Sequence, residues 1–320
     1  MENLNNLLTN HPVLSTSWMW VIFGLIVTTL LFLDLFVFHR HAEEPKIGST
    51  LRIGLSYMLI ALLFGAFVIY EKGLDTGMLF YTGYLVEFSL SMDNIFVISL
   101  IFTSLNIPRI YQHRVLFWGV LGAIVMRAVM ILLGASLVSN FHWILYLFSV
   151  FLIYTGAKML MVKEKEESLT DSRLFKFIEK KFHVTREING EHFFVVKNGK
   201  HYITPLFFAL LVIELMDVIF AVDSIPAIFL ITQNIFVIYT SNIFAILGLR
   251  SLYFLLAAAV SRFIYLKPAL AIILVFIGSK IFLPLLGIEI QSWHSLVITF
   301  SIIFTGIAVS LVKTPAKAKE

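Results

Sequence analysis

Residues 202–232 form a long apolar run, and at its centre stands the stretch Glu214-Leu-Met-Asp-Val-Ile-Phe-Ala-Val-Asp-Ser-Ile-Pro-Ala227. Three of these residues are acids, although the run is long enough to cross the hydrocarbon core of a bilayer, which takes about 20 residues. A charged side chain at the bilayer centre costs about 2.5–3.5 kcal/mol on insertion scales. Such acids face a partner or a cavity, so the stretch predicts a functional membrane helix.

A related pattern upstream indicates an internal duplication. The two copies carry an acid pair, an arginine and a lysine on successive apolar runs: Glu87-x5-Asp93-Asn94-Ile95 and Asp217-x5-Asp223-Ser224-Ile225, Arg127 and Arg250, Lys158 and Lys280. Each copy holds three spans, an odd number, so consecutive copies take opposite orientations. Inverted repeats of three helices recur in transporters, with the substrate site near the bilayer midplane.

The composition of the whole chain predicts the same class. Of its 320 residues, 59% are hydrophobic and 14% charged, whereas an average soluble domain has about 25% charged residues. We predict an all-α polytopic membrane protein of about nine transmembrane helices, in which spans 3–5 and 6–8 form the inverted repeat. The nine predicted spans are residues 18–38, 51–70, 78–102, 115–138, 141–162, 202–232, 235–260, 268–286 and 293–312.

The Lys and Arg residues between the spans predict the orientation. Alternate sides of the membrane carry 19 and 1 of them, which places the N-terminus outside and the C-terminus in the cytosol. The predicted organisation is spans 1–2 in residues 1–77, the first repeat in 78–162, a cytosolic loop in 163–201, the second repeat in 202–286, and the last span with a basic tail in 287–320. We expect the loop to contain a short helix and a hairpin around Asn198-Gly199, and to serve as a structured linker or, alternatively, as a docking element.

The acids in the middle of the spans are the candidate site. Five central acids and two arginines leave a formal charge of −3, which favours a cation site; a purely structural network of buried salt bridges is the alternative. The expected ion-path residues are Glu87, Asp93, Asn94, Glu214, Asp217 and Asp223. Secondary candidates are Ser91, Ser224, Asn242, Met92, Met216 and Asp34, and the charge-pairing or gating candidates are Arg127, Arg250, Lys158 and Lys280.

The available side chains indicate a hard cation. The chain has no Cys, and within the spans His occurs only at the edges, as His142 and His294. Oxygen ligands suit Mg²⁺, Ca²⁺ and Mn²⁺. A thioether ligand from Met92 or Met216 would favour Mn²⁺, although both residues also fit as apolar filling.

Pro226 predicts a break in its helix. The proline ring clashes with the carbonyl four residues earlier, at Val222. A break there would let Asp217 and Asp223 converge, which their spacing of six residues prevents on a straight helix. The freed carbonyl oxygen is a further candidate ligand.

At these residues the sequence resembles the TerC family of integral membrane proteins, in particular its Alx-type bacterial members. The resemblance covers nearly the whole chain and rests on Glu87-Phe-Ser-Leu-Ser-Met-Asp-Asn94, on the stretch from Glu214 to Ala227, and on Gly248-Leu-Arg-Ser-Leu-Tyr253. It implies a bacterial inner-membrane protein with a duplicated three-helix core. For members of the family it implies manganese export, a link to tellurium resistance, or a role in membrane-protein assembly and the loading of secreted metalloproteins.

Residues and resemblance together predict a Mn²⁺ exporter that works by alternating access in the lipid bilayer, with protons as the coupling ion. We expect no prosthetic group, no enzymatic activity and no nucleic-acid partner, and no motif identifies a protein partner. One alternative is a membrane scaffold or assembly factor that docks through residues 163–201. An intramembrane aspartic-protease-like enzyme ranks last, because the Gly-x-Gly-Asp pattern of such proteases is absent.

Overall fold

The computed structural model describes residues 14–34, 47–141, 143–161, 185, 188, 190–197, 200–259, 264–286, 288 and 290–313. The chain divides into two compact units, Met1–Glu44 and Pro45–Glu320. The first unit contains α2 (Leu14–Leu33), whose residues Ser17–Leu33 are an apolar helical stretch. The features below belong to the second unit.

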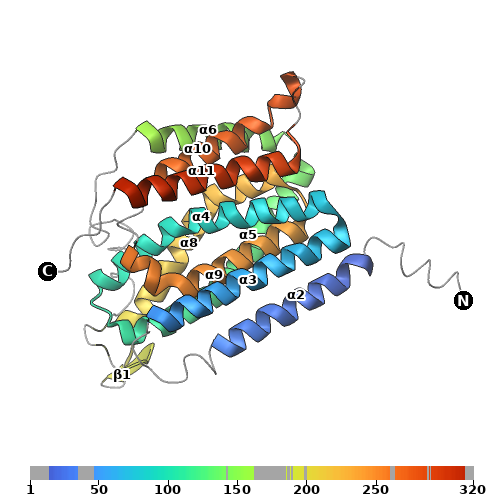
Figure 1. Cartoon of the computed structure of the whole chain (residues 1–320). Coiled ribbons are helices and arrows are strands. Elements are labelled where there is room, and N and C mark those ends of the chain that lie inside the picture. Colours follow the sequence, from blue (N-terminus) through green and yellow to red (C-terminus); the bar gives the residue numbers. More distant parts are fainter. Residues whose placement is uncertain are drawn as a thin grey trace, which may run out of the picture. The chain divides into compact units, whose positions relative to one another are not determined.

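Long apolar helices make up almost all of the described part of Pro45–Glu320 (Figure 1). Seven helices in the described residues are long and apolar enough to cross a membrane, which confirms the all-α polytopic class. The count of nine spans and the inverted repeat remain predictions, since the apolar stretch Ser17–Leu33 of α2 and the 15 residues of α10 are shorter than the seven. The helices are α3 (Ile47–Lys72), α4 (Leu74–Ser104), α5 (Arg109–Asn140), α6 (Ile144–Met161), α8 (Pro205–Ile231), α9 (Ile235–Ala259), α10 (Leu266–Lys280), α11 (Ser292–Lys313) and the short 3₁₀ helix η4 (Leu283–Leu286).

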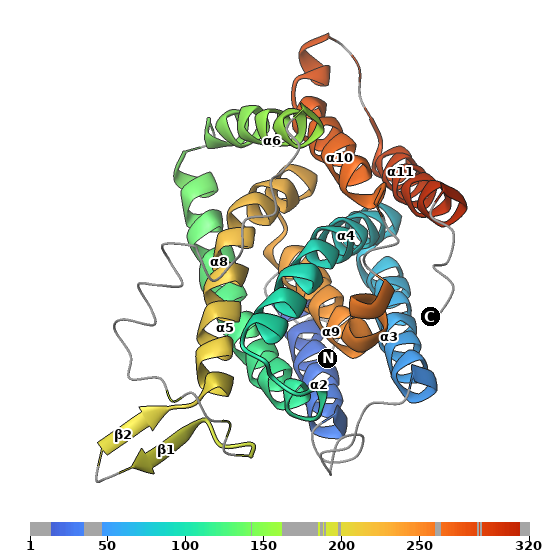
Figure 2. The ribbon, with the colours of Figure 1, turned by 90° about the vertical axis from the view of Figure 1, so that its left-hand side faces the viewer.

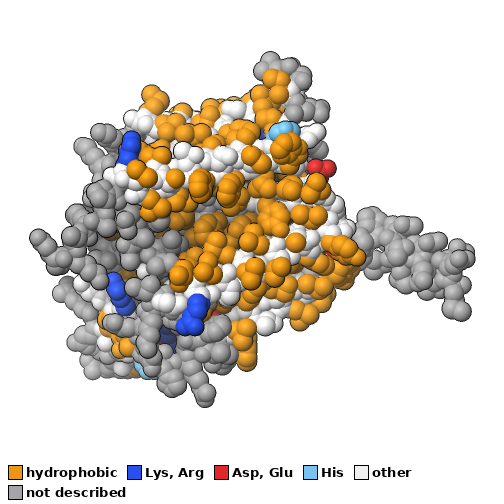
Figure 3. All heavy atoms as spheres, viewed as in Figure 1, with side chains coloured by type: hydrophobic (Ala, Val, Ile, Leu, Met, Phe, Trp, Pro, Cys, Tyr) orange, Lys and Arg blue, Asp and Glu red, His pale blue; other side chains and the backbone are white. Residues whose placement is uncertain are grey.

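The outward faces of these helices are apolar, as a lipid environment requires. Leu63 on α3, Leu133 on α5 and Phe304 on α11 each have about three-fifths of their surface exposed. Figure 3 shows hydrophobic side chains across one face of the molecule, with the visible Lys and Arg side chains gathered toward one end. These outward faces are favoured in contact with hydrocarbon, so the hydrophobic effect does not drive the helices to associate through them.

Helices α4, α5, α8 and α9 form the core, because α4 and α5 each pack against both α8 and α9 (Figure 2). The helices α4 and α9 run parallel. The ring of Phe80 packs on Phe244 near the start of α4, and the ring of Phe102 packs on Tyr253 near its end. The C-terminal ends of α4 and α9 therefore lie together.

The helices α5 and α8 also run parallel. Gly119 of α5 faces Leu210 of α8, and Gly134 faces Phe229 further along both helices. Because only residues 105–108 separate α4 from α5, the N-terminal ends of α5 and α8 lie beside the C-terminal ends of α4 and α9. We name this end of the core the α4–α5 end.

Two tight turns position the core helices. A single residue, Gly73, separates α3 from α4, and its φ of 88° lies in the left-handed region that glycine adopts without strain. After α4, Asn106 takes a φ of 51°, and the amide of Ile107 donates to the carbonyl of Phe102. Asparagine tolerates this conformation better than most residues, so it ends α4 and reverses the chain into α5.

The remaining helices pack around the core. Helix α3, which the sequence groups with the first span, packs on α9 and α4, and α11 packs on α4 and α10. Helices α6 and α10 pack closely through glycines. A Cβ at Gly156 would lie 2.6 Å from the carbonyl oxygen of Ala271, and a Cβ at Gly278 would lie 2.8 Å from that of Ser149.

Two further sequence expectations concern α8 and the residues before it. Strands β1 (Phe194–Lys197) and β2 (Lys200–Ile203) pair antiparallel where the hairpin is predicted, with Phe194 opposite Ile203. The predicted short helix before them and the turn residues 198–199 lie outside the described residues. Helix α8 continues without interruption through Pro226, so its backbone shows no break there. A proline removes one backbone hydrogen bond, which a helix held by its neighbours on both sides tolerates.

Candidate functional site

The guanidinium of Arg127 lies at the centre of the four-helix core, where its side chain is 1% exposed. Its Nη1 donates to Oε1 of Glu87 at 2.6 Å, to Oδ1 of Asn242 at 2.7 Å and to Oγ of Ser224 at 3.1 Å. Its Nε and Nη2 donate to the two carboxylate oxygens of Asp217 at 3.3 and 3.2 Å. This bidentate pairing is the geometry that the planar guanidinium favours. We name Arg127, Glu87, Asp217, Ser224 and Asn242 the arginine centre.

The sequence pattern explains how four helices meet at this one group. Glu87 and Ser91 are four residues apart on α4, and the Ser91 hydroxyl donates to Glu87 Oε1 at 3.0 Å. Asp217 and Ser224 are seven residues apart, so both lie on one face of α8. The amide of Asn242 on α9 is oriented by its own bond to the carbonyl of Ile238, 3.1 Å away. Its Oδ1 is thereby directed at the guanidinium.

The chemistry of the arginine centre is that of a cation held by oxygen atoms. Glu87 is only 2% exposed and Asp217 17%, and buried carboxylates of this kind require a counter-charge. Three oxygens from three helices lie within 3.1 Å of a single nitrogen of Arg127. Two carboxylates and one guanidinium leave a formal charge of −1.

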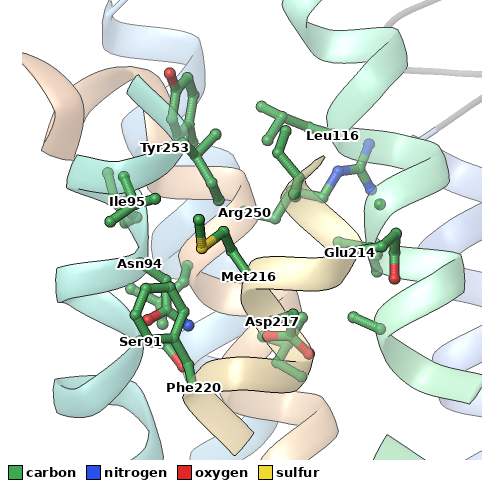
Figure 4. Close-up of a pocket in the computed structure, with 18 residues that line it drawn as sticks. Ser91, Asn94, Ile95, Leu116, Glu214, Met216, Asp217, Phe220, Arg250 and Tyr253 are labelled. Carbon is green, nitrogen blue, oxygen red and sulfur yellow. The ribbon is translucent and has the colours of Figure 1, made fainter. Parts of the chain in front are cut away.

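A cavity of about 90 Å³ lies beside the arginine centre. A cavity of about 10–15 Å³ by the same measure holds one water molecule, so this one has room for several. Its walls come from the halves of α4, α5, α8 and α9 nearest the α4–α5 end, and Asp217 belongs to both cavity and centre. Figure 4 shows the labelled wall residues, among which the polar ones are Ser91, Asn94, Glu214, Asp217, Arg250 and Tyr253.

Glu214 lies one turn before Asp217 on α8 and lines this cavity. Neither of its carboxylate oxygens has a hydrogen-bond partner within the described residues. The carboxylate packs against Gly122 of α5, where a Cβ would overlap it. A glycine on α5 therefore makes the space for this acid, a role that sequence reasoning missed; small residues at positions 119 and 122 were the available signal.

The second intramembrane arginine, Arg250 of α9, lines the same cavity. Its guanidinium carbon lies 5.1 Å from the centroid of the Phe117 ring, and its Nη2 is 3.4 Å from Nε2 of His113. Both contacts are with α5, toward the α4–α5 end. Sequence reasoning placed Arg250 near the acids but had no signal for this aromatic and imidazole contact.

The structure separates the other predicted site residues. Asn94 and Met216 line the cavity, and Met92 is buried in the apolar core. Lys158 and Lys280 lie in the last turns of α6 and α10, whereas Asp34 follows α2 in the first unit. The side chains of Asp93 and Asp223 lie outside the described residues. Among the described side chains, no group of three or more His, Cys, Asp or Glu residues has a geometry that could hold a metal ion.

The fold and the site define a polytopic α-helical membrane protein with a buried carboxylate–arginine centre. The chain belongs to the family described as "Integral membrane protein TerC family", whose model matches residues 72–318. It is 48% identical over 294 residues to an "Uncharacterized membrane protein" of Rickettsia bellii, covering 92% of this chain and 97% of that protein. It is 45% identical over 274 residues to the "Putative membrane-bound redox modulator Alx" of Escherichia coli O6:H1, covering 83% and 85%. No solved structure matches the chain.

Proposed function

We propose that the chain is a membrane transporter for divalent cations, and that its binding site is the cluster of oxygens now held by Arg127. One observation carries this proposal. Oxygens of Glu87, Ser224 and Asn242 converge on a single nitrogen of Arg127 at 2.6–3.1 Å. Carboxylate, amide and hydroxyl oxygens are also the donors that hard divalent cations prefer, at about 2.0–2.6 Å. The guanidinium thus stands in for the transported cation.

Charge then determines what happens when the cation arrives. With Arg127 in place, the carboxylates of Glu87 and Asp217 leave a formal charge of −1, whereas a divalent cation would neutralise both of them. A cation and the guanidinium cannot share the same three oxygens, so binding displaces Arg127. When the cation leaves, Arg127 returns and spares the empty carrier two uncompensated buried carboxylates, which would cost several kcal/mol.

An inverted repeat would allow such a site to open to either side of the membrane. The contact between α6 and α10 supports it. Gly156 packs on residues 271 and 275 of α10, and its sequence equivalent Gly278 packs on residues 149 and 153 of α6. The partners are equivalent too. Residues 149 and 153 precede Gly156 by seven and three positions, and residues 271 and 275 precede Gly278 by the same intervals. Such reciprocal contacts are the mark of a two-fold axis, and later residues of α6 meet earlier residues of α10, as in an antiparallel pair.

The ion, its direction and the orientation of the chain come from the sequence. Mn²⁺ and export are the ion and direction that the family resemblance implies. The distribution of Lys and Arg supports an N-terminus outside and a C-terminus in the cytosol of a bacterial inner membrane. In that orientation the cavity lies on the cytosolic side of the arginine centre, where an exporter takes up its cation. Protons are the proposed counter-ion, because the returning Arg127 offsets only one of the two negative charges of Glu87 and Asp217.

The test is metal flux into inverted membrane vesicles, with Mn²⁺, Mg²⁺ and Ca²⁺ compared at two pH values. We expect uptake of Mn²⁺ by vesicles that contain the protein, and its loss in Glu87→Gln and Asp217→Asn. The matched control is Glu191→Gln, because this carboxylate is 41% exposed and pairs with Arg114 away from the centre. Normal flux in both centre variants, with the proteins present in the membrane, would refute the proposed site.

The name of the Escherichia coli relative describes a redox modulator. Direct thiol–disulfide chemistry would require a cysteine, and this chain contains none. Transport of a redox-active cation would connect the proposed transport function with the redox name of the relative, and it would require no thiol. We therefore do not extend the redox description to the residues of this chain.

A further inference from the structure

The two arginines of the repeat have different surroundings. Arg127 is enclosed by the arginine centre, whereas Arg250 lines the cavity beside Phe117 and His113. The sequence gives both residues equivalent positions, each followed by a similar apolar stretch. Two states of one transport cycle would give the two arginines such different contacts.

The repeat also predicts the groups that Arg250 would meet in the opposite state. Exchange of the two copies converts Glu87 into Asp217, Asp217 into Glu87 and Ser224 into Asn94. The equivalent of Asn242 is Gly119, which offers no side-chain acceptor, so three of the four acceptors have a counterpart. Two of these acceptors, Asp217 and Asn94, already line the cavity that Arg250 lines (Figure 4). Open space therefore connects the side chain of Arg250 with two of its predicted partners.

Packing also differs between the two ends of the core, as the surroundings of the two arginines do. Ile98 on α4 and Ile228 on α8 are equivalent residues, each eleven positions after the aligned acid. Ile98 lines the cavity at the α4–α5 end. Ile228 is 2% exposed within an apolar cluster toward the opposite end. The core is thus hollow on one side of the arginine centre and closed by packed side chains at the equivalent position on the other.

We propose that Arg250 is the second internal counter-cation of the transport cycle. In the state that opens at the opposite end, its guanidinium replaces that of Arg127 between Asp217 and Glu87, and Arg127 withdraws along the newly opened side. The two arginines thus alternate at one pair of carboxylates, and each stabilises the empty carrier in one of its two states. This inference rests on the alternating access proposed above, but not on the identity of the ion. Arg250 is accordingly a positioning residue, which acts through the carboxylates.

Thiol accessibility tests the exchange without any metal, and the cysteine-free chain suits it. Single-cysteine variants Ile98→Cys and Ile228→Cys of the full chain are labelled with a charged thiol reagent in detergent, where both ends face water. The readout is the ratio of the two labelling rates. Arg127→Gln should shift this ratio toward position 228, and Arg250→Gln should shift it toward position 98. A shift of about tenfold in each direction is expected from typical coupling between conformational states.

Opposite shifts are the signature of exchange, because general loosening of the core would raise both labelling rates together. The variants Arg127→Lys and Arg250→Lys retain the charge, and each should produce a smaller shift in the same direction as the corresponding glutamine variant. If a glutamine variant does not fold, the lysine variants test the exchange in its place. Equal ratios in all backgrounds, or shifts of the same sign, would overturn the inference. The result is separable from the flux test, since a chain that moves no metal can still show the reciprocal shifts, and a transporter can lack them.

Discussion

Removal of the Arg127 guanidinium should destabilise the protein more than removal of any exposed charge. The substitution Arg127→Met keeps most of the side-chain volume but leaves Glu87, which is 2% exposed, without the donor now 2.6 Å from its Oε1. Breaking a buried ion pair from one side costs about 3–5 kcal/mol. Asp217 is 17% exposed and can recover some hydration from the cavity, so we expect a loss of about 3 kcal/mol, at the lower end of this range.

The assay is chemical unfolding in detergent, followed by tryptophan fluorescence, with and without a divalent cation. The double variant Arg127→Met/Glu87→Gln should lose less than the sum of the single variants, with a coupling of about 1–3 kcal/mol. Mn²⁺ should stabilise Arg127→Met more than the wild type, because no guanidinium then competes for the oxygens. A loss below about 1 kcal/mol in Arg127→Met, where the expected loss is several-fold larger, or weaker stabilisation by Mn²⁺ than in the wild type, would refute this reasoning.

Three smaller perturbations test the packing around the centre. Gly122→Ala should alter ion flux yet cost less than about 1 kcal/mol in unfolding experiments, because the atoms nearest the new Cβ all belong to the flexible end of Glu214. Unchanged flux would count against a role for that acid. Gly278→Ala should cost about 1–3 kcal/mol by the same measurement, because its Cβ meets backbone on α6, whereas Gly48→Ala faces open space and should be neutral. Arg114→Ala should change thermal stability by less than about 1 kcal/mol, since its ion pair is 41% exposed; a larger loss would mean that the hairpin before α8 contributes to the core.

Much of the candidate site could be predicted because charges are rare in apolar helices. Glu87, Asp217 and Arg127 are recognisable in the sequence by their cost in a membrane. Their pairing is one of the two interpretations that the residues left open, a salt-bridge network or a cation site. The structure shows the buried ion pairs, and under the proposed function the oxygens that now hold the guanidinium would receive the cation.

Other parts of the site depend on contacts between segments that are far apart in the chain. Asn242 ranks as a secondary candidate in the sequence, yet its Oδ1 lies 2.7 Å from Arg127. Asn94 ranks among the primary candidates, yet it lines the cavity instead. Both are amides on apolar helices, so composition and spacing do not distinguish them; the rotation of α4 and α9 about their own axes does.

By itself, the sequence determined the class of protein and the helical spans that carry the acids, and it predicted the pairing of the two copies. These follow from local chemistry. Each apolar stretch must satisfy its backbone hydrogen bonds within a helix, and each charge within the membrane must have a partner or a function. Only the tertiary structure decided which arginine occupies the carboxylates, where the cavity lies and which glycine makes room for Glu214. These features depend on how helices pack against one another, and the same helices can pack in more than one arrangement.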